Sequence, residues 1–185
     1  MKRTFIAVKI TINKQTEEFI CGIQKALHKE AVSWVDTRNM HITLRFLGDT
    51  NEDLIDGIGG RLSEHLNKFS SFDLECKGFG IFKNLYNPRV LWLGIEKPEK
   101  LARLKVEIDN VLQPSGYLKE KRGFYPHLTL GRVKGLNDKE TLKSLLLEYG
   151  NKHIQRFTID QVNFYESILT RRGAVYKTLR EFMLD

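Results

Sequence analysis

An internal duplication of about 86 residues is the strongest constraint on how this chain can fold. Residues 41–48 read H-I-T-L-R-F-L-G and residues 126–132 read P-H-L-T-L-G-R, so the pattern His-x-Thr-Leu occurs twice. In each copy an arginine, Arg3 or Arg89, opens an apolar run 38 positions before the motif histidine (41 − 3 = 127 − 89 = 38). A period this long does not suit a solenoid and favours two equivalent lobes.

The duplication and the length together predict the domain organisation. A chain of 185 residues suits one domain, so we expect residues 1–185 to form a single unit of two intimately packed lobes, at about 1–86 and 87–185. No linker or low-complexity tract separates the two copies.

Hydrophobic periodicity predicts a similar order of elements in both copies. In the first copy we expect strands at 5–10, 34–35, 41–47 and 72–82, and helices at 19–30 and 54–66. In the second copy we expect strands at 90–95, 127–133, 157–165 and 174–182, and helices at 101–112 and 142–149. The whole is predicted to be α+β, with mostly antiparallel sheets and outer helices.

Each His-x-Thr pair would project from one face of its strand, because side chains alternate along an extended chain. The simple explanation is that His41 with Thr43, and His127 with Thr129, only cap or hydrogen-bond at strand ends. The catalytic explanation is that one imidazole acts as base and the other as acid near neutral pH. Threonine hydroxyls and the nearby Arg132 guanidinium suit a phosphoryl group, so this set can cleave a phosphodiester without a metal.

The arginines that follow the motifs differ between the copies. Arg132 lies an odd number of residues after His127, so a bulge or a strand end must turn its side chain toward the site. Its counterpart in the first copy is Phe46, so the lobes are not chemically equivalent. Arg45 alternates onto the face of His41 and could supply a second cation.

Other catalytic chemistries have weaker sequence support. A zinc site could use both motif histidines with a carboxylate such as Glu166, but the chain has no HExxH and no Cys/His cluster. No G-x-S-x-G elbow marks a nucleophilic serine.

Charge and cysteine content indicate the partners and the compartment. The formal net charge is +7 and the pI about 9.4, which favours a polyanion as partner. Cys21 and Cys76 form no disulfide framework and are expected to be reduced thiols. We find neither a signal-like segment nor a membrane-length apolar run, and therefore expect a cytoplasmic protein.

Five segments together resemble one family, the 2H phosphoesterases, which are named for two His-x-Thr/Ser (HxTx) motifs. They are R-T-F-I-A-V, W-V-D-T-R-N-M-H-I-T-L-R-F-L-G, N-P-R-V-L-W, F-Y-P-H-L-T-L-G-R and E-S-I-L-T-R-R-G-A-V-Y. Within that family the chain is most similar to the bacterial and archaeal RNA 2′,3′-cyclic phosphodiesterases, historically called 2′-5′ RNA ligases. The likeness spans nearly the full chain.

The resemblance implies a bilobal fold with pseudo-twofold symmetry, in which two sheets face a central cleft that holds one motif from each lobe. It implies hydrolysis of RNA or nucleotide 2′,3′-cyclic phosphodiester ends to 2′-phosphomonoesters, with no metal or other cofactor, and it allows reversible 2′-5′ RNA ligation. The expected partners are RNA ends or small cyclic-phosphate nucleotides. We expect a monomer with no membrane association and no obligate protein partner.

The resemblance also implies roles for the motif residues. His41 would be the proton donor to the departing 3′ oxygen, and His127 the proton acceptor that activates water. Thr43, Thr129 and Arg132 match the positions that contact the phosphate.

A different class of function is a non-catalytic module that binds single-stranded RNA ends. Phe5, Trp34, Phe46 or Tyr125 could bind bases by stacking in such a module, and Phe46, Phe5 and Tyr125 could do so in the enzyme. For each ring taken singly, packing in the core is the favoured interpretation. Both motifs keep their histidine and threonine, which favours the enzyme.

Overall fold

The strands form two antiparallel sheets in a computed structural model that describes residues 1–120, 123–170 and 173–185. Sheet A has the order β3 (His41–Thr50), β1 (Lys2–Lys9), β8 (Gln161–Thr170) and β9 (Gly173–Met183). Sheet B has the order β2 (Ala31–Trp34), β6 (His127–Gly135), β5 (Val90–Glu96), β4 (Phe72–Phe82) and β7 (His153–Ile159).

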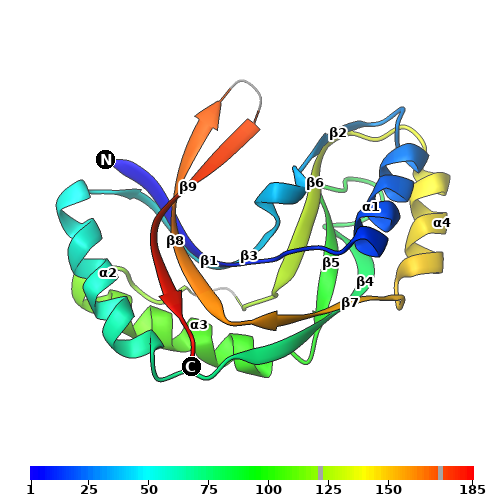
Figure 1. Cartoon of the computed structure of the whole chain (residues 1–185). Coiled ribbons are helices and arrows are strands. Elements are labelled where there is room, and N and C mark those ends of the chain that lie inside the picture. The colour runs from blue at the N-terminus through cyan, green and yellow to red at the C-terminus, as the bar shows by residue number, and fades with distance from the viewer. Residues whose placement is uncertain (121–122, 171–172) are drawn as a thin grey trace.

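Helices cover the outer side of each sheet, as Figure 1 shows. The helices α2 (Glu52–Leu66) and α3 (Glu99–Leu112) lie together against sheet A, whereas α1 (Lys14–Ala26) and α4 (Lys139–Tyr149) lie on the side of sheet B. Short 3₁₀ turns occupy Thr37–Asn39 and Gln113–Ser115. The predicted α+β fold with antiparallel sheets and outer helices is confirmed.

Polar caps explain where three of the helices begin. The side chains of Asn13, Asn51 and Asp138 accept hydrogen bonds from backbone N–H groups in the first turns of α1, α2 and α4. Such caps satisfy donors that a helix N-terminus otherwise leaves unpaired.

The sheets do not follow the two halves of the chain. Each sheet takes strands from both halves: β4 joins sheet B, while β8 and β9 join sheet A. The lobes predicted at 1–86 and 87–185 are therefore interleaved along the sequence. One continuous core of buried side chains runs through both sheets, and we propose on this ground that residues 1–185 form a single domain.

The single strand predicted at 157–165 is two strands. Ile159 ends β7, which pairs with β4 in sheet B, and Gln161 begins β8, which pairs with β1 in sheet A. Asp160 between them is exposed, and its carbonyl accepts a hydrogen bond from the Leu184 N–H. The apolar residues on either side read as one run, because a crossing between sheets changes hydrogen-bond partners without a break in hydrophobicity.

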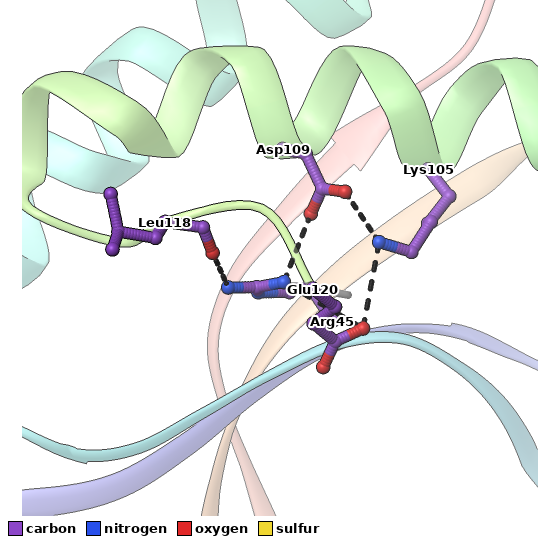
Figure 2. A network of polar contacts seen from close by, with 5 residues as sticks. All are labelled: Arg45, Lys105, Asp109, Leu118 and Glu120. Carbon is purple, nitrogen blue, oxygen red and sulfur yellow. Dashed lines mark hydrogen bonds and ion pairs between the residues drawn. The ribbon is translucent and has the colours of Figure 1, made fainter. Parts of the chain in front are cut away.

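Arg45 does not face the histidines, so its predicted place beside His41 is wrong. Its side chain is only 7% exposed and points toward α3, where Nη1 lies 3.4 Å from an Asp109 carboxylate oxygen and 3.6 Å from one of Glu120 (Figure 2). Nη2 donates to the Leu118 carbonyl, and Lys105 pairs with the same two carboxylates. Arg45 thus ties a motif strand to the segment that follows α3.

We expect Arg45→Met to lower the free energy of unfolding by about 2 kcal/mol. Methionine fills part of the volume but leaves the Leu118 carbonyl and Asp109 short of a partner. Because Lys105 still neutralises Asp109 and the half-exposed Glu120 can turn to water, the loss stays below that of an isolated buried charge. Urea unfolding measures the change.

Arg103→Met is the matched control, since Arg103 is exposed on α3; its free energy of unfolding should change by less than about 0.5 kcal/mol. If Arg45→Met and the native protein had the same urea midpoint of unfolding, the network would not stabilise the fold.

Candidate active site

The two His-x-Thr motifs have the same environment in the two sheets. His41 opens β3 and His127 opens β6, and these strands contact each other across the sheets. The burial pattern of the six residues that begin at each histidine is identical. The histidine and the threonine are half-buried, the second, fourth and fifth residues are buried, and the sixth residue is exposed. The duplication seen in the sequence is therefore also a duplication of local structure.

Both imidazoles are held in the same tautomer. The Nδ1 of His41 lies 2.7 Å from the Asn39 carbonyl oxygen, and the Nδ1 of His127 lies 2.8 Å from that of Tyr125. A carbonyl oxygen only accepts, so each Nδ1 must carry a proton and donate it. Each Nε2 is then the nitrogen left to exchange protons with a substrate.

Equivalent bulges turn the residues that follow the motifs. In β3 the register with β1 skips Leu44, and in β6 the register with β5 skips Leu130. An extra residue reverses the alternation of faces. The bulge therefore sends Arg45 to the helix side and places Phe46 and Arg132 on the face of the motif histidines. The bulge required to orient Arg132 is present.

A cavity of about 400 Å³ lies along this face of sheet A and reaches β6. Its size falls within the range of small-molecule sites. The residues that line it are Arg3, Phe5, His41, Thr43, Phe46, Arg132, Ser167, Leu169, Ala174 and Tyr176.

The structure brings three of the predicted site residues into one cavity but not the other two motif residues. His41, Thr43 and Arg132 line the cavity, whereas His127 and Thr129, which share β6 with Arg132, do not. His127 and Arg132 nevertheless act electrostatically on His41, so the three groups are near one another.

Both histidines have a lowered pKa. The main cause is desolvation, because burial disfavours the imidazolium. The nearby positive charge of Arg132 lowers the pKa of His127 further, and for His41 the charges of His127 and Arg132 act in the same direction. Hydrogen bonds to the Asn39 and Tyr125 carbonyls oppose the shift.

The four aromatic candidates for base stacking lie in different settings. Phe46 is 43% exposed and lines the cavity, with the Arg3 guanidinium carbon 4.9 Å from its ring centre. Phe5 is buried and its ring packs near His41, which supports a structural role. Tyr125 is exposed and does not line the cavity, although its carbonyl holds His127. Trp34 packs against the core.

Arg3 and four residues of β8 and β9 line the cavity without having been predicted as site residues. Ser167, Leu169, Ala174 and Tyr176 line the cavity, and the Tyr176 ring meets the His41 ring edge-on, with the ring centres 5.0 Å apart. Strand alternation groups these side chains on common faces. It does not reveal that β8 pairs with β1, which is what places them beside His41.

Within residues 1–120, 123–170 and 173–185, no group of three or more His, Cys, Asp or Glu side chains is arranged to hold a metal ion. Glu166, the carboxylate considered for zinc, pairs in register with the buried Thr4, so it lies on the opposite face of sheet A from Phe5 and His41.

The sequence model of the family described as the 2′-5′ RNA ligase superfamily matches residues 15–170. The chain belongs to this superfamily. The resemblance drawn from the motifs is confirmed.

Named relatives and solved structures are similar to nearly the whole chain. An RNA 2′,3′-cyclic phosphodiesterase of Thermotoga maritima is 38% identical over 99% of this chain and 96% of its own length. One of Methanothermobacter thermautotrophicus is 32% identical, with 98% of each chain covered. The crystal structure of E. coli LigT complexed with 3′-AMP has a TM-score of 0.75 at 23% identity, covering 99% of this chain and 98% of that one, and shows the shared fold.

Proposed function

We propose that this protein is an RNA 2′,3′-cyclic phosphodiesterase, a phosphoric diester hydrolase acting on RNA or nucleotide cyclic-phosphate ends. The observation that carries the proposal is the pair of His-x-Thr motifs, held in the same tautomer and bulge geometry on two sheets that meet at one cavity. Near-full-length relatives named RNA 2′,3′-cyclic phosphodiesterase, 32–38% identical to this chain, support it.

The proposed reaction uses one imidazole on each side of the phosphorus. Nε2 of neutral His127 takes a proton from water, and the water oxygen bonds to phosphorus. The bond from phosphorus to the 3′ oxygen breaks, and Nε2 of protonated His41 gives its proton to that oxygen. The products are a 2′-phosphomonoester and a free 3′-hydroxyl. A 5′-hydroxyl of RNA in place of water would instead give a 2′-5′ linkage.

The remaining motif residues stabilise the charge that develops on the phosphoryl oxygens. The hydroxyls of Thr43 and Thr129 donate hydrogen bonds, and the Arg132 guanidinium supplies positive charge. Arg132 lines the cavity together with His41 and Thr43, and this placement supports its role.

A non-catalytic module for RNA ends is not favoured. Such a module needs stacking rings and positive charge but has no use for two imidazoles with matched tautomers. Of the rings considered for stacking, Phe46 alone is both exposed and part of the cavity wall.

We infer a cytoplasmic monomer that acts on RNA ends or small cyclic-phosphate nucleotides. None of the helices in the described part of the chain is long and apolar enough to cross a membrane. Both cysteines are free thiols, and burial raises the pKa of the Cys76 thiol to about 12, which keeps it protonated.

Turnover of adenosine 2′,3′-cyclic phosphate after exhaustive chelation with EDTA tests the proposal. We expect full activity and a bell-shaped dependence of kcat/KM on pH. Because both histidines have a lowered pKa, each imidazolium loses its proton below the ordinary value of about 6.5. The acid limb then reports deprotonation of His127, the alkaline limb reports deprotonation of His41, and the optimum lies on the acidic side of neutrality.

The chelated enzyme treated with zinc or manganese is the control. Activity that is lost in EDTA and restored by either ion would establish a metal mechanism. A kcat/KM optimum above pH 8 would contradict the assignment of the two limbs to these histidines.

A further inference from the structure

Among the residues that the structure describes, Arg3 and Arg132 line the cavity beside His41, and no Asp or Glu does. Neither arginine forms an ion pair or a hydrogen bond with a side chain in the part of the chain that the structure describes. Asp49 lies opposite Arg3 in the β1–β3 register, yet the two form no ion pair. Two described arginines without a carboxylate partner, in a cavity of about 400 Å³, suit a ligand with two anionic groups.

Strand register places the two guanidiniums at different levels of the cavity. Along sheet A, Ala7 pairs with Thr43 and Phe5 pairs with Phe46, and the Arg3 guanidinium lies over the Phe46 ring. Residues two apart on a strand are separated by about 7 Å, so Arg3 acts roughly one such step beyond Thr43. Successive phosphates along an RNA strand are separated by a comparable distance.

Contact with the Phe46 ring also restricts where the Arg3 guanidinium can lie. A guanidinium over an aromatic face keeps its N–H donors at the rim, where they can form two parallel hydrogen bonds to a phosphate. The stack covers one face of Phe46, so a nucleobase would have to use the other face.

The opposite end of the site is less suited to an anion. A smaller cavity of about 100 Å³ shares His41 and Tyr176 and contains Lys9 and Arg38. The Arg38 guanidinium lies 2.7 Å from an Asp36 carboxylate oxygen, and this pairing lowers the pKa of Asp36 to about 2. Glu181 lies close enough to act on Tyr165, another wall residue. Carboxylates thus offset part of the positive charge at that end.

We propose that Arg3 binds the phosphate on the 5′ side of the nucleotide whose cyclic phosphate is cleaved. The inference rests on the proposed cyclic phosphodiesterase function and narrows its substrate class. The site accommodates a two-phosphate unit, as at an RNA 3′ end or in a 5′-phosphorylated nucleotide, and acts less well on a nucleoside 2′,3′-cyclic phosphate with a free 5′-hydroxyl.

The test compares three substrates: adenosine 2′,3′-cyclic phosphate, its 5′-phosphorylated form, and the dinucleotide ApA ending in a 2′,3′-cyclic phosphate. We expect kcat/KM of the native protein to be about 10-fold higher for both substrates that carry a 5′ phosphate, through a lower KM. In Arg3→Gln the ratio of kcat/KM with and without the 5′ phosphate should fall to between about 1 and 2. Arg3→Lys should restore part of this preference. Lys9→Gln is the matched control at the other end of β1 and should keep the native ratio.

Three outcomes would overturn the proposal. In the first, the native protein acts equally on substrates with and without the 5′ phosphate. In the second, Lys9→Gln rather than Arg3→Gln removes the preference. In the third, only the dinucleotide has a higher kcat/KM, which would indicate contact with the upstream nucleoside instead of the phosphate. All three leave turnover of the cyclic phosphate intact, so they are distinct from failure of the proposed function.

Discussion

Alanine in place of either His41 or His127 should lower kcat by about 10³-fold on a 2′,3′-cyclic phosphate, with KM changed far less. Each imidazole moves one proton in the proposed reaction, and no described side chain stands ready to replace it. The loss should appear in kcat because the proton transfers occur in the transition state. Steady-state kinetics with adenosine 2′,3′-cyclic phosphate measure the change.

The double variant sharpens this prediction. If the two histidines act in one concerted step, His41→Ala/His127→Ala should be little worse than the more damaging single variant, because residues that work as a unit are strongly non-additive. His28→Ala is the control, since His28 is exposed and bonds only to the Lys25 carbonyl at the end of α1. Unchanged circular dichroism should show that all variants fold.

A single variant that kept near-native turnover would rule out the two-histidine mechanism. Independent, multiplicative losses in the double variant would instead indicate that the histidines act in separate steps.

The local structure of the motif residues could be predicted from the sequence because the same His-x-Thr-Leu pattern occurs in both copies. His41 with Thr43 and His127 with Thr129 show the same burial pattern, as the repeated letters predict. The apolar periodicity of α2 and α3 likewise places these helices correctly, since burying an amphipathic face requires that spacing.

The directions of the side chains that follow the bulges could not be predicted from the sequence. Arg45 and Arg132 both follow a motif, and strict alternation predicts the first to face the site and the second to face away. The extra residues at Leu44 and Leu130 reverse both outcomes. No letter in H-I-T-L-R or H-L-T-L-G states that the leucine is skipped, because a bulge depends on the neighbouring strand.

Pairing between distant strands is the other part that the sequence does not provide. Tyr176 reaches the site because β9 pairs with β8, and β8 pairs with β1. The crossing at Asp160 that makes this arrangement possible lies in a run that reads as one strand. Interleaved lobes follow from these pairings, and a repeat detected along the sequence carries no information about which sheet each copy joins.

Arg132→Lys should retain part of the substrate affinity and lower kcat by about 10²-fold. A guanidinium can form two parallel hydrogen bonds to phosphoryl oxygens, a geometry that an ammonium cannot reproduce. The charge it meets is larger in the transition state than in the cyclic diester, so the loss falls on the chemical step. Thr43→Val and Thr129→Val should each raise the barrier in kcat/KM by about 1–3 kcal/mol, since each removes one hydrogen bond.

The structure makes this comparison specific to one lobe. At the second position after the skipped leucine, β6 carries Arg132 and β3 carries Phe46, so the cation that meets the transition state comes from sheet B alone. Arg103→Lys, on the exposed side of α3, is the control for the chemistry of the substitution and should leave kcat and KM unchanged.

Two results would remove Arg132 from the mechanism. One is that Arg132→Lys equals the native protein in both kcat and KM, and the other is a ligand complex in which this guanidinium points away from the phosphate. Because the Arg3 site is tested by the preference for a 5′ phosphate and Arg132 by kcat on the cyclic phosphate itself, the two arginines can be assigned independently.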